Sequence, residues 1–224
     1  MTLIPLAVAG GAGLSALSSQ ATDNSASQGI SADYVPSFFN NEEWRFILAA
    51  TDRLIPADTN GPGAVSEGVP VFIDKQMELP YGYGHLWYLK GPFAEAVPEM
   101  GYQSSLTPRD IYKVGIKAIN SFCSEHYQKV FADLDHQQQE ALLHQMEGGK
   151  LAISGIPSKQ FFEQLLENTK EGYLSDPMHG GNQTLASWKL IGFPGARADF
   201  LQVMENPDTK YPLGPVSISG KRSV

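Results

Sequence analysis

The stretch "NNEEWRFILAATDRLIP", residues 40–56, carries the clearest helical pattern in the chain. Asn40 or Asn41 can cap its start, and the two glutamates that follow favour the positive end of a helix dipole. Apolar and small side chains share one face at helical spacing: Trp44, Ile47, Leu48, Thr51, Leu54 and Ile55. Because Pro56 lacks the N–H that a further turn needs, the pattern predicts an amphipathic helix that ends just before it.

The same pattern returns twice before residue 131. Pro70 opens a short helix, since proline is well tolerated in the first helical turn. Its apolar positions are Val69, Phe72, Ile73 and Met77. A longer helix begins at Thr107, Pro108 and Asp110, which resemble a capping box with proline at the first helical position. We expect one face of this helix to carry Ile111, Gly115, Ala118, Ile119, Phe122 and His126.

Two more helices are predicted in the second half of the chain. The stretch "LDHQQQEALLHQMEGG", residues 134–149, is closed by Gly148, and "PSKQFFEQLLENTKEGYL", residues 157–174, is capped by Ser158. The buried side of the latter is expected to hold Phe161, Phe162, Leu165, Leu166 and Thr169. Since no stretch shows sustained β alternation, the predicted fold class is all-α.

Long loops rich in glycine, proline and aromatic residues separate these helices, so we expect an irregular helical domain. The most distinctive is "SDPMHGGNQTLASWKLIGFPG", residues 175–195. Asp176 before a proline favours a turn. Gly180 and Gly181 allow backbone angles closed to other residues, and Asn182 can bond neighbouring amides. Four side chains are expected to pin this loop to the helices beneath: Trp188, Leu190, Ile191 and Phe193.

Composition argues for one globular domain and against nucleic-acid binding. The chain has 224 residues, 42% hydrophobic and 18% charged, which is enough apolar material for the core of one soluble domain. Its formal net charge is −8, and no run of Lys and Arg offsets this locally. A phosphate backbone would be repelled, so nucleic acid is not an expected partner.

The N-terminal residues predict export. Leu3 to Leu17 are apolar and rich in small residues, and the polar stretch that follows ends at Ala21, which suits a signal peptide better than a membrane span. No basic residue precedes them, so we expect Met1 to be an internal methionine of a signal whose charged beginning, such as a twin-arginine pair, lies upstream. A buried apolar arm is the alternative. The expected organisation is a signal-like segment at 1–21, a polar linker at 22–33 and one helical accessory domain at 34–224.

Residues able to do chemistry are few. The single cysteine, Cys123, excludes an intrachain disulfide and an iron–sulfur site, and the five histidines form no H-E-x-x-H motif, so no metal site is expected. His126 lies within side-chain reach of Cys123 on the helix, but such pairs arise often by chance. A lone thiol in an exported chain can pair with another chain, or it can be buried and inert; both alternatives stay open.

Aromatic residues gather in the stretch "ELPYGYGHLWYLKGPF", residues 78–93. The ones that could stack on a sugar are Tyr81, Tyr83, His85, Trp87 and Tyr88. A cluster of this kind in a glycine-rich loop more often serves a core or a protein interface. No nucleotide-binding glycine motif is present.

Four stretches together resemble the gluconate 2-dehydrogenase subunit 3 family. They are "RLIPADTNGPGA", "VPVFIDKQM", "YGYGHLWYLKGPF" and, above all, "GYLSDPMHGGNQTLASWKLIGFPGA", and the likeness spans roughly Phe38 to Gly195. Members are the small, or gamma, subunits of membrane-bound, periplasm-facing dehydrogenases of sugars and sugar acids. The absent twin-arginine pair departs from the family pattern.

The resemblance implies a subunit without cofactor, metal or catalytic residues of its own. A large FAD-containing subunit would oxidise the substrate, and a multihaem cytochrome c subunit would pass electrons to membrane quinone. The small subunit would stabilise the flavoprotein and assist its export to the periplasm, at the cytoplasmic membrane. A periplasmic sugar-binding module and an independent, hydrolase-like enzyme are the alternatives.

From the lone thiol, the aromatic stretch and the 175–195 loop we expect the following contacts with a partner: His85, Trp87, Cys123, His179, Gly180, Gly181, Asn182, Trp188 and Phe193.

Overall fold

A computed structural model of the chain describes residues 30–94, 97, 100, 104–198, 205 and 213–222. The predicted signal-like segment and most of the predicted linker lie outside these residues. The described helices are α1 (Asn41–Leu54), α2 (Val69–Met77), α3 (Pro108–Tyr127), α4 (His136–Glu147), α5 (Ser158–Leu174) and α6 (Ala186–Ile191), with short 3-10 helices at Phe131–Asp133 and Pro177–His179. The described ranges contain isolated β-bridges but no strand, so the all-α prediction is confirmed.

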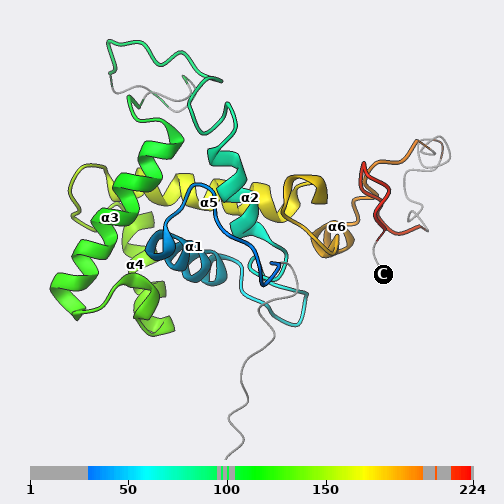
Figure 1. Cartoon of the computed structure of the whole chain (residues 1–224), viewed down its shortest axis with the longest axis horizontal. Coiled ribbons are helices and arrows are strands. Elements are labelled where there is room, and N and C mark those ends of the chain that lie inside the picture. The colour runs from blue at the N-terminus through cyan, green and yellow to red at the C-terminus, as the bar shows by residue number, and fades with distance from the viewer. Residues whose placement is uncertain are drawn as a thin grey trace, which may run out of the picture.

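Helix α5 lies at the centre of the bundle and contacts α1, α2, α3, α4 and α6 (Figure 1). The core around it is aromatic: the ring of Phe46 lies 4.7 Å from that of Phe131 and 5.8 Å from that of Phe161. Gly115 permits the close approach of α3 to α5, because a Cβ at this position would lie 2.2 Å from the ring of Phe161.

The helix starts follow from local capping. The Asn40 side chain accepts from the N–H of Glu43, whose carboxylate accepts in return from the N–H of Asn40, and Thr107 and Asp110 form the same capping box at the start of α3. Gly148 is the C-cap of α4, as predicted.

Three expectations are wrong. Helix α5 is capped by Pro157, while Ser158 belongs to its first turn and its hydroxyl is buried without a hydrogen-bond partner. The buried face of α3 is rotated from the expected one, because His126 is exposed and Ala118 and Phe122 are only half-buried. Its buried residues are Pro108, Ile111, Tyr112, Gly115, Ile116, Ile119, Asn120 and Cys123. Helix α6 lies where an irregular loop was expected.

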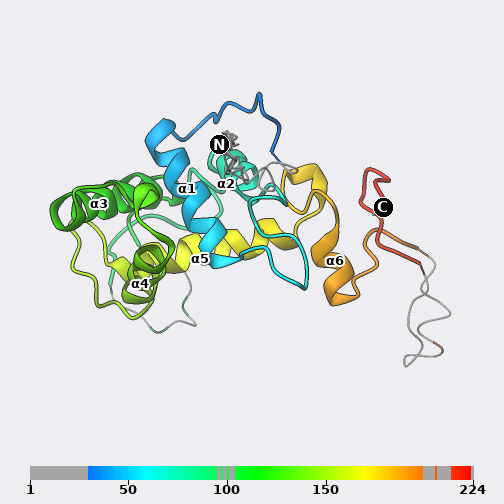
Figure 2. The same ribbon diagram turned by 90° about the horizontal axis from the view of Figure 1, so that it is seen from below.

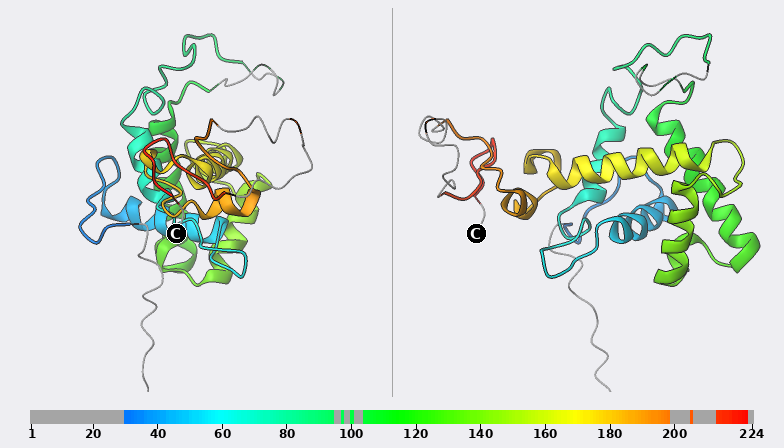
Figure 3. Two further views of the ribbon diagram at one scale, coloured as in Figure 1. Left: turned by 90° about the vertical axis from the view of Figure 1, so that its right-hand side faces the viewer. Right: turned by 180° about the vertical axis from the view of Figure 1, so that it is seen from behind.

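Two parts of the molecule extend from the helical bundle. The connection between α2 and α3 rises from one side, and the C-terminal residues project beyond α6 at another (Figure 1, Figure 3). The view from below also places the C-terminal residues beyond α6, at the end of the molecule farthest from α3 and α4 (Figure 2). These two parts carry the surfaces described next.

Candidate partner-binding surfaces

The connection between α2 and α3 exposes large apolar side chains. We call residues 79–100 the arm; the structure describes 79–94, 97 and 100 of it. Its exposed apolar residues are Leu79, Tyr83, Leu86, Tyr88, Phe93, Val97 and Met100. Leu86 is 65% exposed and Tyr88 is 80% exposed. Apolar residues scattered singly are normal on a protein surface, but their concentration in one segment makes the arm a candidate interaction surface.

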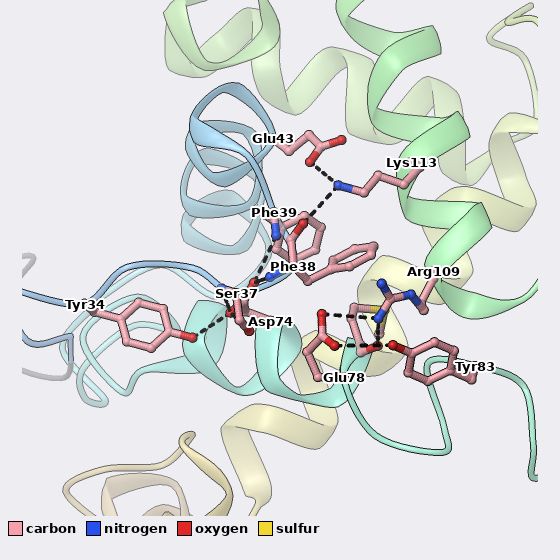
Figure 4. Close-up of polar contacts among 11 residues, drawn as sticks. Tyr34, Ser37, Phe38, Phe39, Glu43, Asp74, Glu78, Tyr83, Arg109 and Lys113 are labelled. Carbon is pink, nitrogen blue, oxygen red and sulfur yellow. Dashed lines mark hydrogen bonds and ion pairs between the residues drawn. The ribbon is translucent and has the colours of Figure 1, made fainter.

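The base of the arm is fixed by Arg109 on α3. Its guanidinium carbon lies 4.5 Å from the centre of the Phe38 ring and 4.3 Å from that of the Tyr83 ring. The same group donates a hydrogen bond to the carbonyl of Met77 and pairs with Glu78 at 3.2 Å (Figure 4). Since a cation is attracted to the face of an aromatic ring, Arg109 ties the start of the arm to the bundle.

A buried polar cluster on α5 forms a second attachment. The hydroxyl of Tyr81 accepts hydrogen bonds from the amide groups of Asn168, at 2.7 Å, and Gln164. Asn168 in turn accepts from the hydroxyl of Tyr112 at 3.0 Å. Burial raises the pKa of Tyr81 to about 12, so its hydroxyl stays neutral at physiological pH. The ring of Trp87 packs edge-on at 5.4 Å from that of Tyr81.

The carboxylate of Asp74 positions Phe38 for its contact with Arg109. Asp74 is fully buried and accepts from the Tyr34 hydroxyl at 2.7 Å and from the N–H groups of Ser37, Phe38 and Phe39 at 2.8 to 3.1 Å (Figure 4). Burial alone would raise the pKa of Asp74, but these hydrogen bonds outweigh it and lower the pKa. Sequence reasoning missed this residue; the signal was a single Asp inside the otherwise apolar start of α2.

Four residues of the 175–195 loop face inward, toward α5, and we call them the inner side of the loop. Gly180, Gly181, Asn182 and Trp188 are buried. The amide of Asn182 donates to the carbonyl of Ser175 at 3.0 Å and accepts from the Ser187 hydroxyl at 2.8 Å. A Cβ at Gly181 would lie 2.0 Å from the carbonyl oxygen of Gly172. In this structure these four residues shape the loop from inside, and their contact with a partner stays a prediction.

Trp188 and Glu67 attach this loop to the bundle. The indole N–H of Trp188 donates to the carbonyl of Leu174 at 2.7 Å, and Trp188 is 6% exposed. The buried carboxylate of Glu67 accepts from the N–H of Thr184 at 2.9 Å and from its hydroxyl at 2.6 Å. Of the four side chains expected to pin the loop, Trp188 does so.

The outer side of the loop is apolar and exposed. Leu190, Ile191 and Phe193 were expected to face the helices beneath, and this expectation is wrong, because they are 56%, 60% and 45% exposed. Phe193 touches Trp188 through its edge, at 4.9 Å between ring centres. His179 is exposed on the same loop.

Residues 213–222 lie against this loop. The N–H of Ala196 donates to the carbonyl of Val216 at 2.7 Å, and the N–H of Ile218 donates to the buried carboxylate of Asp176 at 2.7 Å. The contact adds two exposed apolar residues, Leu213 and Ile218. We call residues 176–198 and 213–222 together the C-terminal end.

The remaining sequence candidates divide by burial. Cys123 is fully buried and burial raises its pKa to about 11, which fits the alternative of an inert thiol and offers no sulfur to another chain in this structure. His126 is exposed and stacks on Phe122 at 4.0 Å. His85 is exposed on the arm, where its ring stacks on that of Tyr83 at 5.8 Å.

Groups able to perform chemistry do not converge in the described residues. No group of three or more His, Cys, Asp and Glu side chains there could hold a metal ion, and none of the helices described is both long and apolar enough to cross a membrane. An open hollow of about 630 Å³ beside α1 and α3 is lined mainly by polar residues, some of which pair with one another. Lys113 pairs with Glu43, and the Asn120 amide donates to Glu42 at 2.8 Å.

The described chain is thus an all-α protein whose distinctive surfaces are apolar rather than reactive. The model of the family described as gluconate 2-dehydrogenase subunit 3 matches residues 41–195, more than half of the chain, and the chain belongs to this family. The resemblance inferred from the motifs is confirmed. The family consists of dehydrogenase subunits, so membership implies that this chain has other subunits as partners. No curated protein and no solved structure matches the chain.

Proposed function

We propose that this chain is the non-catalytic small subunit of a periplasm-facing, FAD-dependent dehydrogenase complex of the gluconate type, and that the arm binds the FAD-containing large subunit. The observation that carries the proposal is the row of exposed apolar side chains on a segment whose base is fixed by Arg109 and Tyr81. Family membership supports the assignment to a dehydrogenase complex.

The fixed base of the arm favours tight binding. Residues at the base of the arm that are already fixed in the free subunit lose little conformational entropy on association. Aromatic side chains dominate the energy of protein interfaces, and the arm offers Tyr83, Tyr88 and Phe93 partly or largely exposed. A flavoprotein surface that covers these rings would remove from water the apolar area that the free subunit exposes.

Binding of this kind explains how a subunit without catalytic groups assists an enzyme. A partner that binds only the folded flavoprotein stabilises the folded state by mass action. In the proposed complex FAD and haem c belong to the large subunit and to a multihaem cytochrome c subunit, and the large subunit selects the substrate. The small subunit stabilises the flavoprotein and accompanies it to the periplasmic side of the cytoplasmic membrane.

Co-purification from the source cell tests the proposal. A tagged chain with its native upstream region is expected to recover a large FAD protein and a haem c protein, identified by mass spectrometry. The double substitution Leu86→Asp with Tyr88→Asp is expected to lower flavoprotein recovery about tenfold or more, because it places two charges in the interface.

Val35→Asp is the matched control, because Val35 is 80% exposed and lies outside the arm. Recovery should be unchanged in the control, and all three proteins should unfold at the same temperature. Equal recovery by the arm variant and the control would contradict the role of the arm. Recovery of the tagged chain alone would contradict the subunit assignment, and binding of gluconate by that chain would favour a sugar-binding module.

A further inference from the structure

The C-terminal end differs in charge from the rest of the chain. The first 174 residues contain 11 Lys and Arg against 20 Asp and Glu, whereas the last 50 contain five against four. Within residues 176–198 and 213–222 the sole acidic residue is Asp176, and its buried carboxylate accepts from the N–H groups of Met178 and Ile218. Among the described residues from 176 onward, four are basic (Lys189, Arg197, Lys221 and Arg222) and two are acidic (Asp176 and Glu205), so this part of the chain carries a positive charge balance on an acidic protein.

Basic and apolar side chains are interleaved on this surface. Lys189 is exposed directly beside Leu190 and Ile191 on α6, and Lys221 and Arg222 are exposed close after Ile218, which is 70% exposed. Hydrogen bonds to the two carboxylate oxygens of Asp176 bring Met178 and Ile218 together, although they are 40 positions apart. Two separate segments that both expose basic and apolar side chains thus lie side by side at this end of the molecule.

The position of this surface leaves it accessible when the arm is occupied. The C-terminal end, which includes α6, lies at one end of the molecule, whereas the arm follows the last residue of α2 and extends on a different side of the bundle (Figure 1, Figure 3). A large subunit bound at the arm need not cover the C-terminal end.

We infer that the C-terminal end binds directly to the surface of an anionic phospholipid bilayer. Leu190, Ile191, Phe193, Leu213 and Ile218 enter the boundary between headgroups and acyl chains, and Lys221 and Arg222 face the lipid phosphates. Exposed apolar residues flanked by basic ones are the combination that interfacial membrane binding requires. The inference goes beyond the proposed function, in which the membrane is reached only through the other subunits.

Charge complementarity favours a bilayer over a second protein surface. An anionic membrane repels most of an acidic chain and attracts the basic side chains of the C-terminal end, which orients the protein with its acidic bundle away from the lipid. Long lysine and arginine side chains can keep their charges at phosphate depth while neighbouring aliphatic groups go deeper.

Vesicle flotation of the purified full chain tests the inference. The probe is vesicles of phosphatidylglycerol and phosphatidylethanolamine, compared with vesicles of phosphatidylcholine alone. We expect binding to the anionic vesicles that weakens as salt concentration rises, because the lysine and arginine attraction is screened.

Two substitutions assign the binding to this surface. Leu190→Asp with Ile191→Asp is expected to lower the bound fraction about tenfold, and Lys221→Glu with Arg222→Glu, which leaves the apolar residues in place, about threefold or more. The arm variant Leu86→Asp with Tyr88→Asp is the matched control and should bind vesicles as the unchanged chain does. The second variant keeps the test decisive if the first fails to fold.

The results of vesicle binding and flavoprotein recovery, taken together, distinguish a failure of this inference from a failure of the proposed function. Vesicle binding that neither C-terminal variant changes, or no vesicle binding at all, would overturn the inference and leave flavoprotein recovery untouched. Loss of flavoprotein recovery by Leu190→Asp with Ile191→Asp, with vesicle binding unchanged, would show a protein interface instead. Loss of vesicle binding with normal flavoprotein recovery is the expected result.

Discussion

The arm and the C-terminal end both expose large apolar side chains, but the bundle holds them by different contacts. The arm begins at a guanidinium packed between two aromatic rings and at a tyrosine buried in a polar cluster. The C-terminal end is held on the bundle by the buried carboxylate of Glu67, which accepts from Thr184, and by the buried indole of Trp188, which donates to the carbonyl of Leu174. A cation between aromatic rings fixes one surface, whereas a buried carboxylate and a buried indole fix the other.

The surfaces differ in chemistry as well. The arm is rich in aromatic rings, which give large rigid contact areas with a protein partner. The C-terminal end combines aliphatic side chains with lysine and arginine, which suits an anionic lipid surface. Apolar exposure alone therefore does not identify a partner; the charges and the ring content beside it separate the two proposed occupants.

Trp188→Ala should have the largest effect on stability and should act on the C-terminal end alone. Removing a buried Trp leaves a cavity and takes away the hydrogen bond to Leu174, so we expect the free energy of unfolding to fall by about 3 kcal/mol or more. Urea unfolding followed by circular dichroism measures it. Ile191→Ala is the control, since the side chain of Ile191 is 60% exposed and should change stability by about 0.5 kcal/mol or less. Similar losses in both variants would contradict the division into an inner and an outer side of this loop.

Asp74→Asn should destabilise the base of the arm and lower the free energy of unfolding by about 2 kcal/mol. The Asn side chain has one acceptor oxygen, whereas the hydrogen-bond donors around Asp74 are divided between two carboxylate oxygens. The pKa of Asp74 is lowered in the folded state, so the stability that it contributes is present above the pKa of an unfolded Asp and is lost as pH falls through the lower, folded pKa.

Urea unfolding at a series of pH values below about 5 checks this second prediction. The unchanged chain should lose stability more steeply with acid than the Asp74→Asn variant, because the variant lacks the titrating carboxyl. Asp33→Asn, at an exposed residue, is the control and should follow the unchanged chain. Parallel pH profiles for all three proteins would mean that another carboxyl accounts for the acid sensitivity.

The helices could be predicted from the sequence because their signals are local. Asn40 with Glu43, and Thr107 with Asp110, lie within one turn and cap whatever bundle surrounds them. The buried face of α3 could not be fixed in this way. Asn120 belongs to this face because its amide accepts from the N–H of Phe131 and donates to the carboxylate of Glu42. Glu42 is distant from Asn120 in the sequence.

The surfaces were predicted less well, since exposure depends on which helices meet. The sequence pointed to the 175–195 loop, but not to the division between buried Trp188 and exposed Leu190 and Ile191, which depends on how the short α6 packs on α5. Asp74 gave no periodic signal at all. Its partners come from Tyr34 to Phe39, more than 30 residues earlier, and only the folded chain brings them together.

Arg109→Leu should have the smallest effect on stability and a selective effect on the arm. Leucine keeps an apolar side chain between Phe38 and Tyr83 but loses the cation–π attraction, the hydrogen bond to Met77 and the pair with Glu78. We expect a loss of about 1 to 2 kcal/mol in the free energy of unfolding and a fall of about tenfold in flavoprotein recovery, because the arm is no longer held in one position.

Arg45→Leu is the matched control for Arg109, since Arg45 forms an exposed ion pair with Asp133, and exposed pairs contribute little. Vesicle binding separates the two surfaces in the same preparation: the Arg109 variant should bind anionic vesicles as the unchanged chain does. If it lost vesicle binding and flavoprotein recovery together, the arm and the C-terminal end would act as one coupled surface. The proposal that each of them binds its own partner independently would then be wrong.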